Sequence, residues 1–313
     1  MPTPFPIGDV NVYLIDDDPV TLIDAGPKTE AALAALRDNL RQHKFALADI
    51  KRIVLTHAHE DHCGLAKTIK NESKDCEIFV HAWETGHLFG RARLEDAHLL
   101  QRAGVPETIL REMNGFYAAF QPLTDRLDDD EFEFLIDENE LEFASGSLRV
   151  LHTPGHTPGS CSLVREANRT VFAGDCVLKR LTPNPILAVD PFDANKRFQS
   201  LGEYLVSLAR LREIAPTLVY GGHGEPIMDF EEIFNRYVRA INERQARVLD
   251  ALKTEKQGAT AWQVAVKLFP AAVDEKVHRF LAVSEAVAHL DYAESAGKIA
   301  VEIENGVEIY LKR

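Results

Sequence analysis

Three histidines and an aspartate fall within six positions of one short segment, LTHAHEDHCG at residues 55–64. They are His57, His59, Asp61 and His62. Imidazole nitrogens and carboxylate oxygens are ligands that divalent transition metals prefer in proteins. His57 and His59 are two residues apart, so in an extended segment they point to the same side and can share one ion. Asp61 and His62 lie further on and can reach a second ion, so the segment predicts over half of a two-metal site.

Three more candidate ligands follow along the chain, each at the end of a short apolar strand and beside glycine. They are His156 in HTPGHTPGS, Asp175 in FAGDC and His223 in GGHGEP. Glycine and proline make tight turns and let the backbone come close to an ion. Because each ligand follows a strand, we expect all of them at one rim of a sheet. His152 shares the proline-rich turn, but His156 is preferred because glycine precedes it and Thr-Pro-Gly follows.

Other reactive side chains have simpler interpretations. The lone histidines His43, His81 and His98 are interpreted as surface or hydrogen-bonded residues. Cys63 and Cys176 flank ligand positions, but bound metals already supply a nucleophile, so both are interpreted as small packing residues.

The elements expected to position these ligands are short strands separated by helices. Before residue 82, the apolar patterns predict strands at 10–16, 20–26, 50–56 and 77–81, with helices at 28–43 and from 64 onward. The stretch 82–122 reads as a helical insertion or lid, and the acidic stretch 124–142 as a solvated edge hairpin. Further strands are predicted at 148–153, 161–166, 170–175 and 217–222, with a helix over 196–213.

The pattern changes near residue 229, where we place the boundary between a catalytic domain (1–228) and a C-terminal domain (229–313). The C-terminal part predicts a long helix, a second helix capped by Thr260, and a third over 274–296 that ends at Gly297. A hairpin follows, turning at Asn305-Gly306. Three helices and a hairpin predict a winged-helix-like module.

The chain has 313 residues, of which 45% are hydrophobic and 27% are charged. This composition is typical of a globular protein. No run of 18 apolar residues is present, which argues against a membrane-spanning helix. The start, MPTPFPIGDVN, has no signal-peptide pattern, and the four cysteines have neither metal-knuckle nor disulfide-framework spacing. We therefore expect a cytoplasmic protein without membrane partners. The net charge of −14 discourages non-specific binding to nucleic acid without excluding a local basic groove.

The order HxHxDH at 57–62, then His156, Asp175 and His223, resembles that of the metallo-β-lactamase fold hydrolases. The similarity covers about residues 8–228 and is greatest to the subgroup with a C-terminal winged-helix-like domain. The resemblance implies an α/β (α+β) fold, a four-layer αβ/βα sandwich with the metals at one edge. It also implies the ligand sets, which are His57, His59 and His156 on metal 1, Asp61, His62 and His223 on metal 2, and Asp175 bridging.

The same resemblance implies a mechanism. Two divalent ions about 3.5–4 Å apart can hold a hydroxide between them, which attacks an electrophilic carbon or phosphorus. Asp61 and Asp175 are the expected catalytic residues, with Asp61 also able to assist proton transfer. Zinc is the expected metal, and iron or manganese are the alternatives.

The favoured substrate is a small ester, thioester or lactone. An endoribonuclease or phosphodiesterase of the lactamase-β-like type is the alternative, and a mononuclear-iron sulfur dioxygenase is less favoured. Residues 231–313 hold 12 Lys/Arg and 13 Asp/Glu, whereas a module that binds phosphates is usually basic. The C-terminal module is therefore interpreted as a pocket cap or a homodimer surface.

Three other residues are considered as substrate contacts. Lys179 and Arg180 are interpreted as a solvated loop pair, with contact to an anionic substrate group as the alternative. Tyr220 is a candidate pocket residue.

Overall fold

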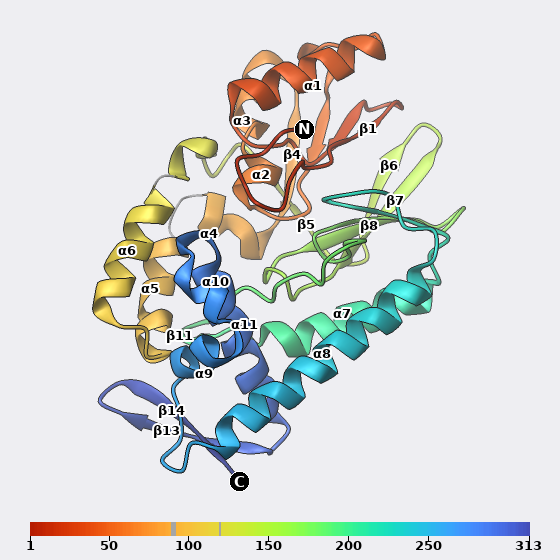
Figure 1. Cartoon of the computed structure of the whole chain (residues 1–313). Coiled ribbons are helices and arrows are strands. Elements are labelled where there is room, and N and C mark those ends of the chain that lie inside the picture. The colour runs from red at the N-terminus through yellow and green to blue at the C-terminus, as the bar shows by residue number, and fades with distance from the viewer. Residues whose placement is uncertain (89–91, 119) are drawn as a thin grey trace.

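Two five-stranded sheets lie face to face at the centre of the molecule (Figure 1). The computed structural model describes residues 1–88, 92–118 and 120–313. The first sheet has the order β1 (Tyr13–Ile15), β2 (Thr21–Ile23), β3 (Arg52–Val54), β4 (Glu77–His81) and β5 (Glu133–Leu135). The second has the order β12 (Leu218–Gly221), β9 (Thr170–Gly174), β8 (Cys161–Arg165), β7 (Gly146–His152) and β6 (Glu140–Phe143).

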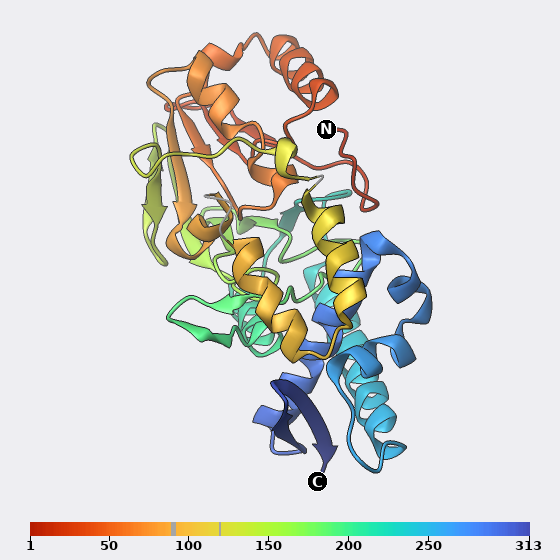
Figure 2. The same cartoon turned by 90° about the vertical axis from the view of Figure 1, so that its left-hand side faces the viewer.

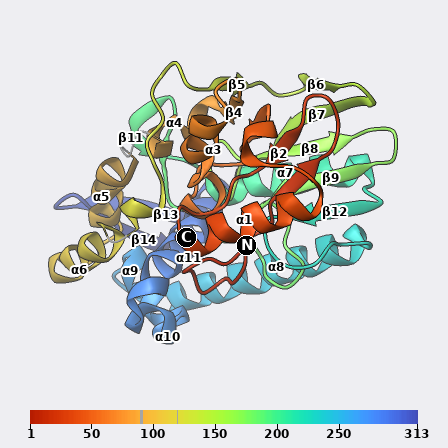
Figure 3. The same ribbon diagram turned by 90° about the horizontal axis from the view of Figure 1, so that it is seen from above.

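Helices cover the outer face of each sheet, as Figure 1 and the view from above in Figure 3 show. Helices α1 (Glu30–Gln42) and α3 (Ala66–Glu72) lie over the first sheet, and α7 (Ser200–Ile214) and α8 (Phe230–Lys253) lie over the second. Buried apolar side chains fill the three spaces between these layers, with Leu36 and Ile53 in one, Val54 and Leu163 in the next, and Leu208 in the third. The four-layer α/β architecture expected from the sequence is confirmed.

The strands that precede the predicted ligands all end at the same rim. β2, β3, β4 and β5 are parallel to one another, and β12 is parallel to β9. β7 and β9 are both antiparallel to β8 and therefore run the same way. The segments that leave the carboxyl ends of β3, β7, β9 and β12 carry His57, His156, Asp175 and His223. Sheet direction thus gathers residues that are far apart in sequence.

Three predicted elements differ from the structure. Residues 124–142 do not form a hairpin, because β5 pairs with β4 in the first sheet and β6 pairs with β7 in the second. Leu135 and Leu141 are both buried between the sheets, so this segment crosses the edge of the sandwich. The helix expected from residue 64 is preceded by a short α2 (Glu60–Cys63) that carries two predicted ligands. Part of the helix expected over 196–213 is strand β11 (Asp193–Arg197), which pairs with β10 (Val189–Asp190).

The expected helical insertion contains α4 (Thr85–Leu88), α5 (Ala92–Arg102) and α6 (Glu107–Ala118), and its residues 89–91 and 119 lie outside the described residues. The C-terminal part contains α9 (Ala261–Leu268), α10 (Pro270–Asp274), α11 (Lys276–Ser295) and the hairpin β13 (Ile299–Glu304) to β14 (Val307–Lys312). Thr260 caps α9 as predicted, and Asn305 and Gly306 have the positive φ angles of 51° and 82° expected for the turn. The helix predicted over 274–296 is α11, and the extended Glu275 separates it from the short α10 that precedes it.

The insertion and the C-terminal part share one hydrophobic core, and Figure 2 shows α5 and α6 beside the C-terminal helices. Leu99 of α5 and Met113 of α6 belong to the same buried cluster as Val264, Val283 and Leu290. The described residues include no helix long and apolar enough to cross a membrane.

Replacing Arg197 by methionine is expected to lower the free energy of unfolding by about 3–5 kcal/mol, because it leaves the buried carboxylate of Asp291 without a counter-ion. Arg197 is 8% exposed, its Nε lies 2.6 Å from Asp291 Oδ2, and it also pairs with Glu308 and Tyr310. Urea unfolding measures the change. Arg111→Met is the control, because the Arg111–Glu107 pair is exposed and should contribute under about 1 kcal/mol. Equal losses for the two variants would contradict the prediction.

Candidate metal centre

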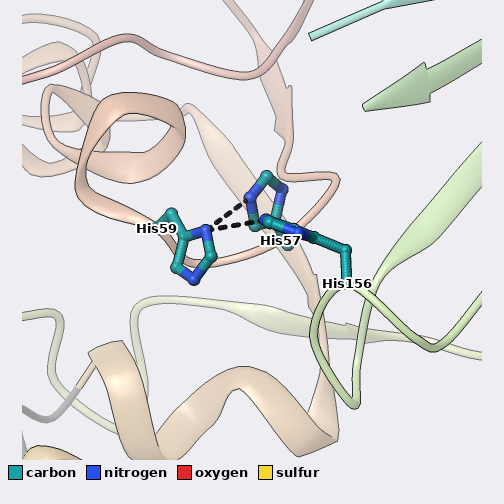
Figure 4. Close-up of side chains that lie close together, drawn as sticks. All are labelled: His57, His59 and His156. Carbon is teal, nitrogen blue, oxygen red and sulfur yellow. Dashed lines mark hydrogen bonds between the residues drawn. The ribbon is translucent and has the colours of Figure 1, made fainter. Parts of the chain in front are cut away.

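Three imidazole rings converge at the rim, as Figure 4 shows. His57 Nε2 lies 3.0 Å from His59 Nδ1, and His156 Nε2 lies 3.1 Å from the same atom. Each pair of nitrogens this close needs a proton or a cation between them, since two lone pairs facing each other repel. The three ring nitrogens therefore form one group of atoms that could bind a single metal ion.

A second group lies beside the first. His62 Nε2 is 3.5 Å from Asp175 Oδ1 and 4.0 Å from Asp61 Oδ1. His223 Nε2 is 3.4 Å from Asp61 Oδ2 and 3.6 Å from Asp175 Oδ2. Asp175 also reaches the first group, with its Oδ2 lying 3.8 Å from His156 Nε2. Asp175 thus lies between the two groups, and the structure brings together all seven predicted side chains, six of them buried and His59 half-buried.

Hydrogen bonds at the outer ring nitrogens set which histidine nitrogen faces the centre. His156 Nδ1 lies 2.9 Å from the carbonyl oxygen of Asn184, and His223 Nδ1 lies 2.8 Å from that of Asp9. A carbonyl only accepts, so both Nδ1 atoms are donors and both neutral rings present the Nε2 lone pair inward. His62 Nδ1 pairs in the same way with Asp24 Oδ2 at 2.8 Å. This arrangement is typical of metal-binding histidines.

Buried polar atoms without a partner support the same conclusion. His62 Nε2, His223 Nε2 and Asp175 Oδ1 are buried and have no hydrogen-bond partner in the described part of the chain. Such atoms cost free energy unless something satisfies them. A pair of divalent cations fits this set of nitrogen and carboxylate ligands, which is also the donor type that zinc, iron and manganese accept.

Asp24 is a site residue that the sequence reasoning missed. It is 2% exposed and accepts hydrogen bonds from the Thr56 amide at 2.8 Å and the Thr56 hydroxyl at 2.9 Å, besides its contact with His62. Thr56 Oγ1 in turn lies 3.1 Å from His57 Nδ1. One carboxylate therefore orients a ligand of each group. In the sequence, its signal is the place of an acidic residue at the end of the apolar strand VTLID. In the structure, Asp24 has a positive φ of 61°.

Glu84 is the second residue that was missed. Its carboxylate is fully buried and accepts from the amides of Ala58 and Gly159 at 2.8 Å each and from the Thr157 hydroxyl at 2.7 Å. Glu84 thus joins the loop of His57 and His59 to the loop of His156. In AWETG nothing distinguishes it from a surface glutamate, because its partners come from distant segments.

Burial and neighbouring charges move the pKa values of the ligands in opposite directions. Burial lowers the pKa of His57 and of His156, which favours the neutral rings that bind metals. Burial opposes protonation of His62, but Asp24, Asp175 and Asp61 outweigh it and raise its pKa to about 10. The pKa of Asp61 is lowered because His62 and His223 outweigh the effect of burial.

Other residues singled out in the sequence lie outside the ligand set. His152 Nε2 lies 2.8 Å from the carbonyl oxygen of Pro158, and its ring stacks on His81 with centroids 4.1 Å apart. His152 therefore lies outside the groups of side chains that could hold a metal ion, whereas His156 belongs to one of them. Lys179 and Arg180 both pair with Glu225. Tyr220 stacks on Phe172 at a centroid distance of 5.2 Å.

The family assignment follows from the whole chain. A model of the metallo-beta-lactamase superfamily matches residues 6–223. The chain belongs to this superfamily. It is 33% identical over 324 residues to the probable metallo-hydrolase YqjP of Bacillus subtilis, covering 100% of this chain and 96% of that protein. The chain is therefore a metallo-hydrolase.

A solved structure and a second curated protein are also similar to the chain. The metallo-beta-lactamase family protein TTHA1429 from Thermus thermophilus matches with a TM-score of 0.84 and 28% identity, over 100% of this chain and 97% of that one. The atrochrysone carboxyl ACP thioesterase of Aspergillus fumigatus is 24% identical over 235 residues, covering 74% of this chain and 56% of that protein.

Proposed function

We propose that the chain is a dinuclear metal-dependent hydrolase that acts on a small ester, thioester or lactone. The observation that carries the proposal is the convergence of seven ligand side chains in two groups that share Asp175. His57, His59 and His156 would hold one ion, and Asp61, His62 and His223 the other. When bound, two such ions supply an activated water molecule and polarise the bond to be cleaved.

The remaining residues support hydrolysis by water and not by a protein nucleophile. Cys63 and Cys176, the two cysteines beside the ligands, are buried, and burial raises the pKa of each thiol to about 12. Such thiols stay protonated at neutral pH and are poor nucleophiles. Asp24 and Glu84 hold the ligand loops in place, and Asp61 stays ionised as a member of the second group.

Two observations favour a small substrate with a reactive carbonyl. The C-terminal part is nearly neutral, with 12 Lys/Arg against 13 Asp/Glu in residues 231–313, which disfavours a polyanion such as RNA. A superfamily relative bears the name of a thioesterase. We also propose that residues 1–228 form a catalytic domain and residues 229–313 a C-terminal domain. The C-terminal domain would cap the substrate pocket.

Metal analysis tests the dinuclear part of the proposal. Protein prepared with excess Zn²⁺, Fe²⁺ or Mn²⁺ and then freed of loose ions by gel filtration should retain about two ions per chain. Removal with a chelator should abolish hydrolysis, and returning the ions should restore it. Retention of less than about one ion per chain after loading with each metal would rule out the dinuclear centre.

A substrate panel tests the second part. Wild type should hydrolyse members of a set of acyl thioesters, lactones and aryl esters at least about a hundredfold faster than a phosphodiester or a structured RNA. His59→Ala should lose that activity, because it removes a ligand atom that two other ligand nitrogens face. The ribonuclease alternative would be favoured by a different result. In that case wild type would cleave RNA in a metal-dependent way, Asp61→Ala would abolish the cleavage, and acyl compounds would not be hydrolysed.

A further inference from the structure

A backbone carbonyl from outside the ligand loops holds the metal-facing orientation of His156. His156 Nδ1 donates to the carbonyl oxygen of Asn184 at 2.9 Å, and the amide of Ile186 donates to the His156 carbonyl at 3.2 Å. The segment that contains Asn184 and Ile186 therefore contacts both the ring and the backbone of this ligand. Its position determines which way the ring points.

The C-terminal helix α11 fixes that segment. Asn184 Nδ2 donates to Glu285 Oε2 at 2.8 Å and to the carbonyl oxygen of Leu281 at 3.0 Å, both in α11. The Leu281 carbonyl can only accept, so the amide nitrogen of Asn184 must be the atom that faces α11. Asn184 Oδ1 has no hydrogen-bond partner in the described part of the chain, so its side chain is held through this nitrogen.

Glu285 is held in turn by residues of the C-terminal part. It is 6% exposed and pairs with Arg244 of α8. Its Oε1 lies 3.3 Å from Nε2 of the fully buried His289, whose Nδ1 lies 2.8 Å from Gln245 Oε1. The carboxylate thus has Arg244 and the ring of His289 on the α8–α11 side and one amide on the side of the metal centre.

We propose that Glu285 and Asn184 are positioning residues for His156, so that the C-terminal part of the chain helps to complete the site for one of the two ions. The proposal rests on the two-metal function proposed above. Partners of the outer nitrogen of a metal-binding histidine typically change metal affinity about 10–100-fold when they are removed. The effect should fall on the ion held by His57, His59 and His156, because Asn184 contacts only the last of these.

Cobalt titration of the whole metal-free chain tests the proposal, with visible absorption and equilibrium dialysis to measure each ion. Wild type should bind two Co²⁺ ions. Asn184→Ala and Glu285→Ala should weaken one of the two binding steps by up to about tenfold and leave the other unchanged, because they free the segment but keep the carbonyl that contacts His156. Glu285→Gln should weaken the same step less than Glu285→Ala, because a glutamine oxygen still accepts from Asn184 although its NH₂ group then faces Arg244.

Two controls separate positioning from general loss of stability. Arg279→Met removes a buried hydrogen bond to the carbonyl oxygen of Val273 and an ion pair with Glu112 from the same helix α11, and these partners are separate from Glu285 and Asn184. It should leave both binding steps unchanged. Asn184→Ala keeps the carbonyl that contacts His156 and removes only a half-buried side chain. It therefore tests the positioning role even if Glu285→Ala fails to fold.

The outcomes distinguish the two proposals. If wild type binds fewer than two ions, the dinuclear function and this inference both fail. If wild type binds two and Asn184→Ala binds both with unchanged affinity, only the positioning role is wrong. Equal weakening of both binding steps, or the same selective loss in Arg279→Met, would also overturn the positioning role in favour of a general structural role.

Discussion

Replacing Asp175 by asparagine is expected to reduce hydrolysis at least about a thousandfold and to lower the metal content from two ions per chain to one. Asp175 is the residue whose oxygens reach both ligand groups, Oδ1 lying 3.5 Å from His62 Nε2 and Oδ2 3.8 Å from His156 Nε2. Asparagine keeps the shape but loses the negative charge and one ligand oxygen. A thousandfold loss corresponds to about 4 kcal/mol of transition-state stabilisation.

Steady-state kinetics on the best substrate of the panel and elemental analysis of the same sample measure the two effects. Asp190→Asn is a matched control, because Asp190 Oδ1 accepts from the amides of Phe192 and Asp193 in a turn that asparagine also supports. An Asp175→Asn enzyme that keeps two ions and loses less than about tenfold in kcat/KM would show that this carboxylate does not join the two groups.

Replacing Asp24 by asparagine is expected to weaken metal binding about 10–100-fold, although Asp24 is not a ligand. The carboxylate accepts three hydrogen bonds, from the amide and hydroxyl of Thr56 and from His62 Nδ1. An asparagine oxygen can still accept from the amide, but its NH₂ group would face donors. His62 then has no acceptor that favours a proton on Nδ1, and the tautomer with Nε2 protonated cannot bind the ion.

Competition with a chromophoric chelator measures the affinities, and thermal unfolding of the metal-free protein shows whether the fold persists. Asp229→Asn is the control, since Asp229 caps α8 and asparagine is an equally good cap. Asp24→Asn protein that binds both ions as tightly as wild type would mean that the orientation of His62 does not depend on this carboxylate.

The local patterns predicted the elements that carry the ligands well, because short β-branched runs and helical spacing report burial on one face. They failed where pairing depends on distant partners. Residues 133–135 and 140–143 look like two arms of a hairpin, but each arm pairs with a strand of a different sheet. Residues 193–197 carry a helix-compatible sequence but pair with residues 189–190 as a strand. In both cases the tertiary contacts outweigh the local preference.

The sequence by itself determined the chemistry of the site. Seven candidate ligand residues are recognisable because their side-chain types and their places after strands are local properties, and the seven meet at one rim once the strands align. Only the tertiary structure decided how those ligands are oriented. Asp24, Glu84 and the pair Asn184–Glu285 act through hydrogen bonds to distant segments. Their role depends on three-dimensional proximity and low solvent exposure, which make a single buried hydrogen bond strong enough to fix a ring.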